Sequence, residues 1–107
     1  MEVPTISLQE LNAALTSGED LVLLDIREPF ELEISKLENV VHIPMGELAN
    51  RVGELNPDSN IVVVCRTGNR SAHVTAFLQQ VGFKHVRNMA GGMNGWAREV
   101  DPKVAMY

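Results

Sequence analysis

The chain has 107 residues, of which 45% are hydrophobic, so it is long enough to bury one core and too short for two. Its formal net charge of −5 lacks the basic excess that nucleic acid or an anionic membrane would require of a partner. One cysteine and three scattered histidines give neither a disulfide framework nor metal-ligand spacing. The composition therefore predicts a single domain over residues 1–107, with no metal or cofactor and with no nucleic-acid or membrane partner.

The first residues also carry information about location. Met1 to Pro4 lacks the basic-then-apolar layout of a signal peptide, and no apolar run approaches the ~18 residues of a membrane span. We therefore expect a cytoplasmic protein, in which an unpaired thiol stays reduced.

The first half of the chain reads as alternating strands and helices. Residues 5–6 are expected to form a short strand, and Ser7-x-x-Glu10 is a capping box that begins a helix ending at Gly18. The apolar run 21–24 is too short for a helix and predicts a buried strand leading into Asp25. A second helix is expected to begin at Glu28-Pro29, because proline is tolerated in the first turn.

The same alternation continues in the second half. In chain order, the expected elements are a strand at 40–43, a brief helix over 47–55, a strand at 61–64, an amphipathic helix ending at Gly82, a strand at 85–88 and a closing helix that follows Gly91-Gly92 and carries Trp96. This order predicts an α/β fold, with a mostly parallel sheet of about five strands and helices on both faces. Ligands of such sheets bind beyond the carboxyl ends of the strands, where Asp25 and Cys65 are both expected to lie.

Cys65 is the strongest candidate for a functional residue. A free cysteine at the end of a strand is often a small buried hydrophobe, but this one opens the loop Arg66 to Ser71 in front of a helix. Such a short turn aims several backbone N–H groups at its centre, and the helix dipole adds to their effect. Both features favour a thiolate, so we interpret Cys65 as a nucleophile.

The rest of the loop is expected to serve that sulfur. Gly68 permits an otherwise strained backbone, Arg66 and Arg70 are expected to contact an anionic substrate or intermediate, and Thr67 and Asn69 to contribute backbone groups. Ser71 is expected to cap the following helix rather than to contact the sulfur directly.

Asp25 and Arg27 are expected to form a structural ion pair that holds the loop, because a carboxylate too near Cys65 would oppose the thiolate. His73 is expected to be an exposed helix residue and Trp96 to pack in the core.

Three motifs resemble the rhodanese-like sulfurtransferases. The segment Cys65 to Ser71 matches the family's loop Cys-Arg-x-Gly-x-Arg-Ser/Thr in full. Asp25 to Glu31 is similar to its Asp-x-Arg-x-x-x-Glu segment, and Asn88 to Trp96 is similar to its closing Gly-Gly-x-x-x-Trp element. One departure is Ser35 to Val40, where the family commonly has Gly-His-Ile-x-Gly-Ala. The resemblance implies a three-layer rhodanese-like fold over nearly the whole chain.

The resemblance also implies a reaction. Cys65 would take the outer sulfur of thiosulfate or a similar donor, release sulfite, and pass the sulfur from a persulfide to cyanide, a cellular thiol or a protein acceptor. The related loop for mercaptopyruvate has Gly after the cysteine, so Arg66 favours thiosulfate. The tail Trp96 to Tyr107 resembles rhodanese domains fused behind E1-like adenylyltransferases of molybdopterin and thiamine sulfur supply.

Two alternatives remain open on the sequence. The chain could be a persulfide carrier or interaction module in a protein sulfur relay, as its tail suggests. It could also be a cysteine phosphatase or arsenate reductase, although those loops place arginine six positions after the cysteine, where this chain has Ser71.

Overall fold

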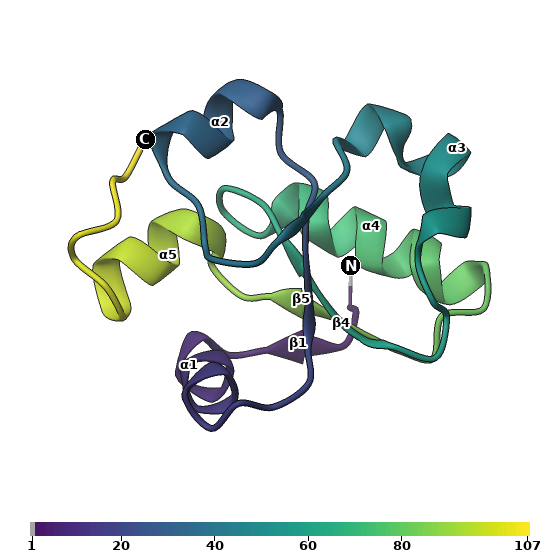
Figure 1. Ribbon diagram of the computed structural model, residues 1–107, viewed down its shortest axis with the longest axis horizontal. Helices are drawn as coiled ribbons and strands as arrows, with labels where there is room; N and C mark the ends of the chain where they lie inside the picture. The colour runs from purple at the N-terminus through teal and green to yellow at the C-terminus, as the bar shows by residue number, and fades with distance from the viewer. Residues whose placement is uncertain (1) are drawn as a thin grey trace.

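The structure is a computed structural model and describes residues 2–107. Strands and helices alternate along the described chain, as Figure 1 shows. In chain order the elements are β1 (Thr5–Ile6), α1 (Leu8–Thr16), β2 (Val22–Asp25), α2 (Pro29–Ile34), β3 (Val41–His42), the 3₁₀ turn η1 (Met45–Glu47), α3 (Leu48–Arg51), the 3₁₀ turn η2 (Val52–Glu54), β4 (Asn60–Val64), α4 (Asn69–Gln80), β5 (His85–Met89) and α5 (Gly92–Glu99).

The five strands form one parallel sheet in the order β1-β5-β4-β2-β3. The apolar strand β4 lies at its centre, between β5 and β2, and β2 is in register with it so that Asp25 pairs with Val64. Cys65 therefore leaves the sheet at the carboxyl end of its middle strand. This is the α/β architecture that the alternation of elements predicts.

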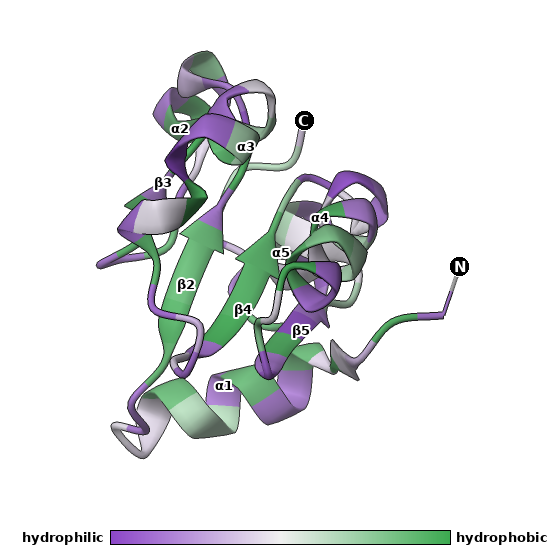
Figure 2. Cartoon of the chain, turned by 90° about the vertical axis from the view of Figure 1, so that its right-hand side faces the viewer, coloured by the Kyte–Doolittle hydropathy of each residue, from purple (hydrophilic) through white to green (hydrophobic). Residues whose placement is uncertain are grey.

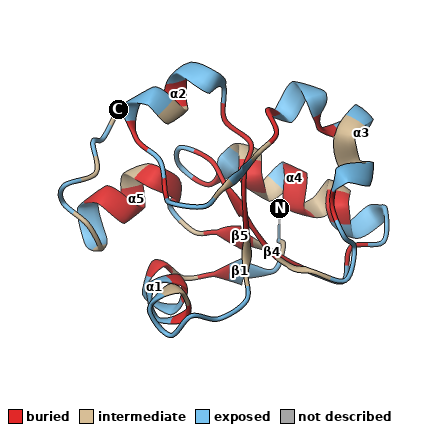
Figure 3. Ribbon diagram, viewed as in Figure 1, coloured by how far each residue is buried: buried red, intermediate tan, exposed pale blue. Residues whose placement is uncertain are grey.

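Two apolar layers cover the two faces of the sheet, because side chains of a strand alternate between faces. Ile61, Val63 and Cys65 belong to one core cluster together with residues of α3 and α4. Val62 and Val64 belong to the other, with residues of α1 and α5. Figure 3 shows the buried strands between the half-buried helices, so the predicted helices on both faces are confirmed.

Helix α2 and helix α3 lie beyond the carboxyl ends of β2 and β4 rather than flat on a face, as Figure 2 shows. Helix α2 begins where the sequence predicts it: Pro29 occupies the first turn, and the Glu31 carboxylate accepts the Glu28 backbone N–H at 2.8 Å. This position brings the first turn of α2 to the loop that follows β4.

Two local expectations are modified. The helix predicted over 47–55 is divided into α3 and two 3₁₀ turns, because α3 begins without a side-chain cap and Gly53 weakens its continuation. In residues 35–40, where the sequence departs from the family's pattern, Asn39 adopts a left-handed backbone with φ of +58°. Asparagine tolerates that conformation better than most residues, so the turn closes without glycine.

Candidate active site

Three polar groups surround the sulfur of Cys65. The residue is only 1% exposed, and its Sγ accepts hydrogen bonds from the backbone N–H of Gly68 at 3.1 Å and of Ser71 at 3.4 Å. The Ser71 hydroxyl lies 3.1 Å away. Gly68 has φ of +99°, a left-handed conformation that turns its N–H inward. The loop is thus a nest built around one sulfur atom, as its length predicts.

Asn88 on β5 holds this nest in place through two hydrogen bonds. Its Oδ1 accepts from the Ser71 hydroxyl, and its Nδ2 donates to the Gly68 carbonyl at 3.3 Å. The expectation that Ser71 caps the helix is wrong, because α4 begins at Asn69 with Gly68 as its N-cap residue. The Ser71 hydroxyl instead lies between Asn88 and the sulfur. The sequence interpretation missed this role of Asn88, because its burial and its register with Val63 of the central strand are set by the fold.

The start of α5 supports the loop from another side. The backbone N–H groups of Met93 and Asn94 donate to the carbonyls of Cys65 at 2.9 Å and Arg66 at 3.0 Å. A Cβ at Gly92 would lie 2.5 Å from atoms of both carbonyl groups. The Gly91-Gly92 pair therefore lets the helix end approach the loop backbone closely, which explains its place in the sequence.

Arg70 lies in the first turn of α4 and is already paired. Its two terminal nitrogens each lie 2.9 Å from one oxygen of the Glu31 carboxylate, whose side chain is 6% exposed. The hydrogen bonds from Arg70 hold the pKa of Glu31 at about 2, and the same pair raises the pKa of Arg70. Both loop arginines were expected to contact an anionic substrate or intermediate, but the charge of Arg70 is balanced by a carboxylate 39 residues away in sequence.

Arg66 lines an open hollow of about 600 Å³ beside the loop. Its guanidinium lies over the ring of Tyr107, 5.1 Å from the centroid. The hollow is lined by Glu28, Phe30, Glu31, Arg66, Thr67, Asn69, Arg70 and Tyr107. Thr67 and Asn69 are exposed at its rim, and the Asn69 carbonyl lies 3.0 Å from the ring nitrogen Nδ1 of His73, an exposed helix residue as expected.

Asp25 and Arg27 form a fully buried ion pair at 2.8 Å. The remaining hydrogen bonds of the Arg27 guanidinium go to the carbonyls of Glu31 and Ser35 and to the Tyr107 hydroxyl. The pair was expected to hold the Cys65 loop, but these contacts hold the two ends of α2 and the last residue of the sequence. Its effect on the loop is therefore indirect, through Glu31.

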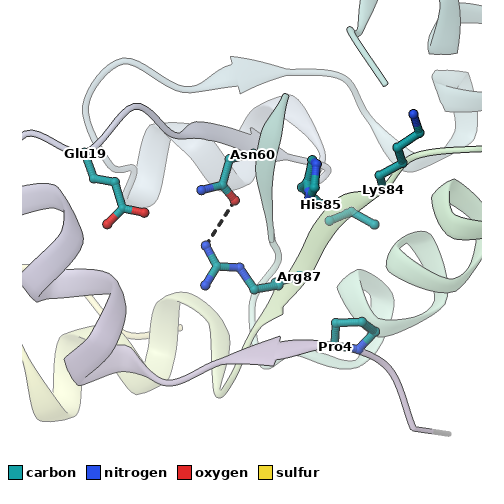
Figure 4. Close-up of a pocket in the computed structure, with 7 residues that line it drawn as sticks. Pro4, Glu19, Asn60, Lys84, His85 and Arg87 are labelled. Atoms are coloured by element: carbon teal, nitrogen blue, oxygen red, sulfur yellow. Dashed lines mark hydrogen bonds between the residues drawn. The ribbon is translucent and has the colours of Figure 1, made fainter. Parts of the chain in front are cut away.

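A hollow of about 470 Å³ lies at the opposite, amino edge of the sheet and is lined by residues such as Asn60 and Arg87. Arg87 Nη2 donates to Asn60 Oδ1 at 3.1 Å (Figure 4). Within the described range there is no group of three acidic, histidine or cysteine side chains placed to hold a metal ion. None of the helices described is long and apolar enough to cross a membrane.

The comparison with known proteins identifies the family of this domain. The rhodanese-like domain model matches residues 7–99, and the chain belongs to that family. The expected three-layer fold and the resemblance on which it was based are confirmed.

Several curated relatives share this domain. The "Putative sulfurtransferase YtwF" of Bacillus subtilis is 38% identical over 103 residues, which cover 96% of this chain and 99% of that protein. A sulfurtransferase of Allochromatium vinosum is 36% identical, with 96% of each chain covered. The "Putative sulfur carrier protein YrkF" of Bacillus subtilis is 37% identical, and the match spans 92% of this chain but about half (54%) of that protein. These relatives support the assignment of the chain to the rhodanese-like sulfurtransferases.

Solved structures agree. A rhodanese-related protein of Thermoplasma volcanium superimposes with a TM-score of 0.83 at 33% identity, covering 91% of this chain and 93% of that one. The human single-domain sulfurtransferase TSTD1 superimposes with a TM-score of 0.78 at 26% identity, covering 92% and 98%.

The resemblance of the tail is also confirmed. The adenylyltransferase and sulfurtransferase UBA4 of Debaryomyces hansenii is 34% identical over 113 residues, which cover 95% of this chain and 25% of that protein. The chain thus corresponds to about a quarter of such fused proteins.

Proposed function

We propose that the domain formed by residues 1–107 transfers a sulfane sulfur through a persulfide on Cys65, with thiosulfate as a donor. The observation that carries the proposal is the placement of two backbone N–H groups and one hydroxyl around a single buried sulfur. Donors fixed around one atom stabilise a negative sulfur before and after transfer, without a separate base.

The reaction balances in two displacements. The Cys65 thiolate attacks the outer sulfur of thiosulfate, a new S–S bond forms, and the old one breaks so that sulfite leaves with its electron pair. The resulting Cys65 persulfide carries one negative charge. Cyanide or a thiolate then attacks its terminal sulfur, and the Cys65 thiolate is released together with thiocyanate or a new persulfide.

Intact mass spectrometry tests the first displacement. After incubation with thiosulfate, we expect the wild-type protein to gain the mass of one sulfur atom and to lose it when cyanide is added. Cys65→Ser is the control and should gain nothing, because the chain has no other cysteine. A wild-type protein that gains no sulfur from thiosulfate and forms no thiocyanate would contradict thiosulfate as the donor.

A second candidate is a carrier in a protein sulfur relay. It is favoured by the Arg70–Glu31 pair, which leaves less positive charge for a dianion than the sequence suggests, and by a sulfur carrier protein among the relatives. A carrier would accept sulfur from a cysteine persulfide of another protein but not from thiosulfate. The same mass measurement with both donors separates the two candidates.

The phosphatase alternative has a direct test. Six positions after Cys65 stands Ser71, whose hydroxyl contacts the sulfur, so the nest lacks the arginine that would bind a tetrahedral phosphate there. We expect no turnover of an aryl phosphate above that of Cys65→Ala.

A further inference from the structure

Tyr107 returns from the segment after α5 to the mouth of the Cys65 loop. Val104 packs against the same core cluster as α5, and the backbone N–H of Tyr107 donates to the Asn94 side chain at 3.1 Å. Asn94 in turn donates its backbone N–H to the Arg66 carbonyl at 3.0 Å. The position of Tyr107 is thus tied to the loop backbone as well as to the core.

The Tyr107 hydroxyl joins the two ion pairs described above. It accepts from Arg27 Nη1 at 2.8 Å and donates to Glu31 Oε1 at 2.8 Å. Burial is the main cause of the raised pKa of Tyr107, so the hydroxyl keeps its proton and continues to donate. The hydroxyl therefore links Tyr107 to α2, in addition to the contacts of Val104 and Asn94 that hold this segment without it.

The ring supports the one arginine at the mouth without a carboxylate partner among the described residues. The Arg66 guanidinium is 5.1 Å from the ring centroid, within the range of a cation–π contact, and Arg66 makes no ion pair there. Arg70 is balanced by Glu31. Arg66 is therefore the group that an incoming anion meets as a positive charge with no carboxylate of the described residues at ion-pair distance.

We propose that Tyr107 is a positioning residue whose ring holds the Arg66 guanidinium over the mouth, so that the site prefers anionic reagents to neutral ones at Cys65. This proposal depends on the proposed function in one respect only, namely that the natural anionic reagent is a sulfur donor. It assigns donor preference to a residue outside the loop and 42 positions from Cys65 in sequence.

A pair of alkylating reagents measures this preference without any sulfur transfer. Iodoacetate is an anion and iodoacetamide is its neutral analogue, and Cys65 is the only thiol in the chain that either reagent can alkylate. The ratio of their two rate constants reports the charge felt at the mouth, and a general loosening of the loop changes both rates alike. One unit charge at roughly 6 Å in water changes this ratio about threefold.

Three variants separate ring, hydroxyl and guanidinium. Arg66→Gln should lower the iodoacetate-to-iodoacetamide ratio about threefold. Tyr107→Leu removes the ring and should lower the ratio about two- to threefold, whereas Tyr107→Phe keeps the ring and should leave it near the wild-type value. In the Arg66→Gln background, Tyr107→Leu should have no further effect on the ratio.

Several results would overturn the assignment. An unchanged ratio in Arg66→Gln would show that Arg66 does not act on anions, and this variant remains informative even if Tyr107→Leu fails to fold. Equal changes in both rates in Tyr107→Leu, or an undiminished effect in the Arg66→Gln background, would mean that Tyr107 has only a structural role. If the ratios behave as expected but thiosulfate leaves no sulfur on Cys65, the proposed donor fails and the positioning role stands.

Discussion

At the level of single residues, the sulfur nest depends on a side chain outside the loop. Asn88 accepts from the Ser71 hydroxyl and donates to the Gly68 carbonyl, and both residues also contact the Cys65 sulfur. One amide therefore holds two of the groups that face the sulfur. The Ser71 hydroxyl can turn its proton toward either Asn88 or the sulfur, so it can follow a change in sulfur charge.

Asn88→Ala is expected to reduce persulfide formation on Cys65 about tenfold, the effect of losing roughly 1.4 kcal/mol of stabilisation in the transition state. It should also lower the free energy of unfolding by about 1–3 kcal/mol, because two buried groups lose their partner. Quenched-reaction mass spectrometry with thiosulfate measures the first effect and urea unfolding the second.

Thr75→Val is the matched control for Asn88→Ala. Its hydroxyl is also buried and donates to the Ser71 carbonyl at 2.8 Å, but it does not reach the sulfur. We expect a loss of about 1 kcal/mol in stability with little change in transfer rate. Equal losses of transfer in both variants would mean that Asn88 acts through stability alone.

The sequence predicts only part of this site. Cys65 and Gly68 are recognisable because a nucleophile and a left-handed glycine lie within one short segment. Asn88, Glu31 and Tyr107 reach the site through contacts 17 to 76 residues apart in the chain. Local spacing does not reveal such contacts, and it therefore suggested a more positive mouth than the structure has.

At the level of elements, the close approach of α5 to the loop defines a second prediction. Gly92 has φ of +58°, and a Cβ there would overlap the Arg66 and Cys65 carbonyls at 2.5 Å. Gly92→Ala should lower the free energy of unfolding by about 2 kcal/mol or more, since strain of the backbone adds to the overlap. It should also slow transfer, because the loop carbonyls must move.

Gly53→Ala is the control for Gly92→Ala in the same urea titration. Gly53 lies in η2 with nothing within 4 Å of an added Cβ and with no positive φ, so its change in stability should stay within about 0.5 kcal/mol. A Gly92→Ala protein as stable as Gly53→Ala would contradict the close approach.

Element type was predictable wherever a segment has a strong pattern of its own. The Ser7 capping box, the apolar run of β4 and the glycine after α4 each specify their element locally. The element type of segment 45–54 was not predictable in this way. Its short turns depend on Leu48 and Leu55 packing into the core rather than on a helical pattern. Tertiary packing decides such weak segments.

At the level of the whole molecule, the parallel strand order brings distant segments to one edge. Strand β2 leads into α2, and β4 leads into the Cys65 loop beside it, so Glu31 and Arg70 meet across the two connections. The pair joins α2 to the loop. Its contribution to stability is therefore a measure of how firmly the two segments are held together.

The Glu31–Arg70 pair should make stability depend on pH in the acid range. The pKa of Glu31 is about 2 in the folded protein against an ordinary value of 4.5, so the unfolded chain binds the proton more tightly. The stabilisation is then fully present above about pH 4.5 and is lost as the pH falls toward 2.

Glu31→Gln removes the titrating group but keeps the shape of the side chain. In urea unfolding, the wild-type protein should exceed this variant by about 1–3 kcal/mol at pH 7, and the difference should shrink steadily between pH 4.5 and pH 2.5. A difference that stays constant over that range would show that the carboxylate is not held by Arg70.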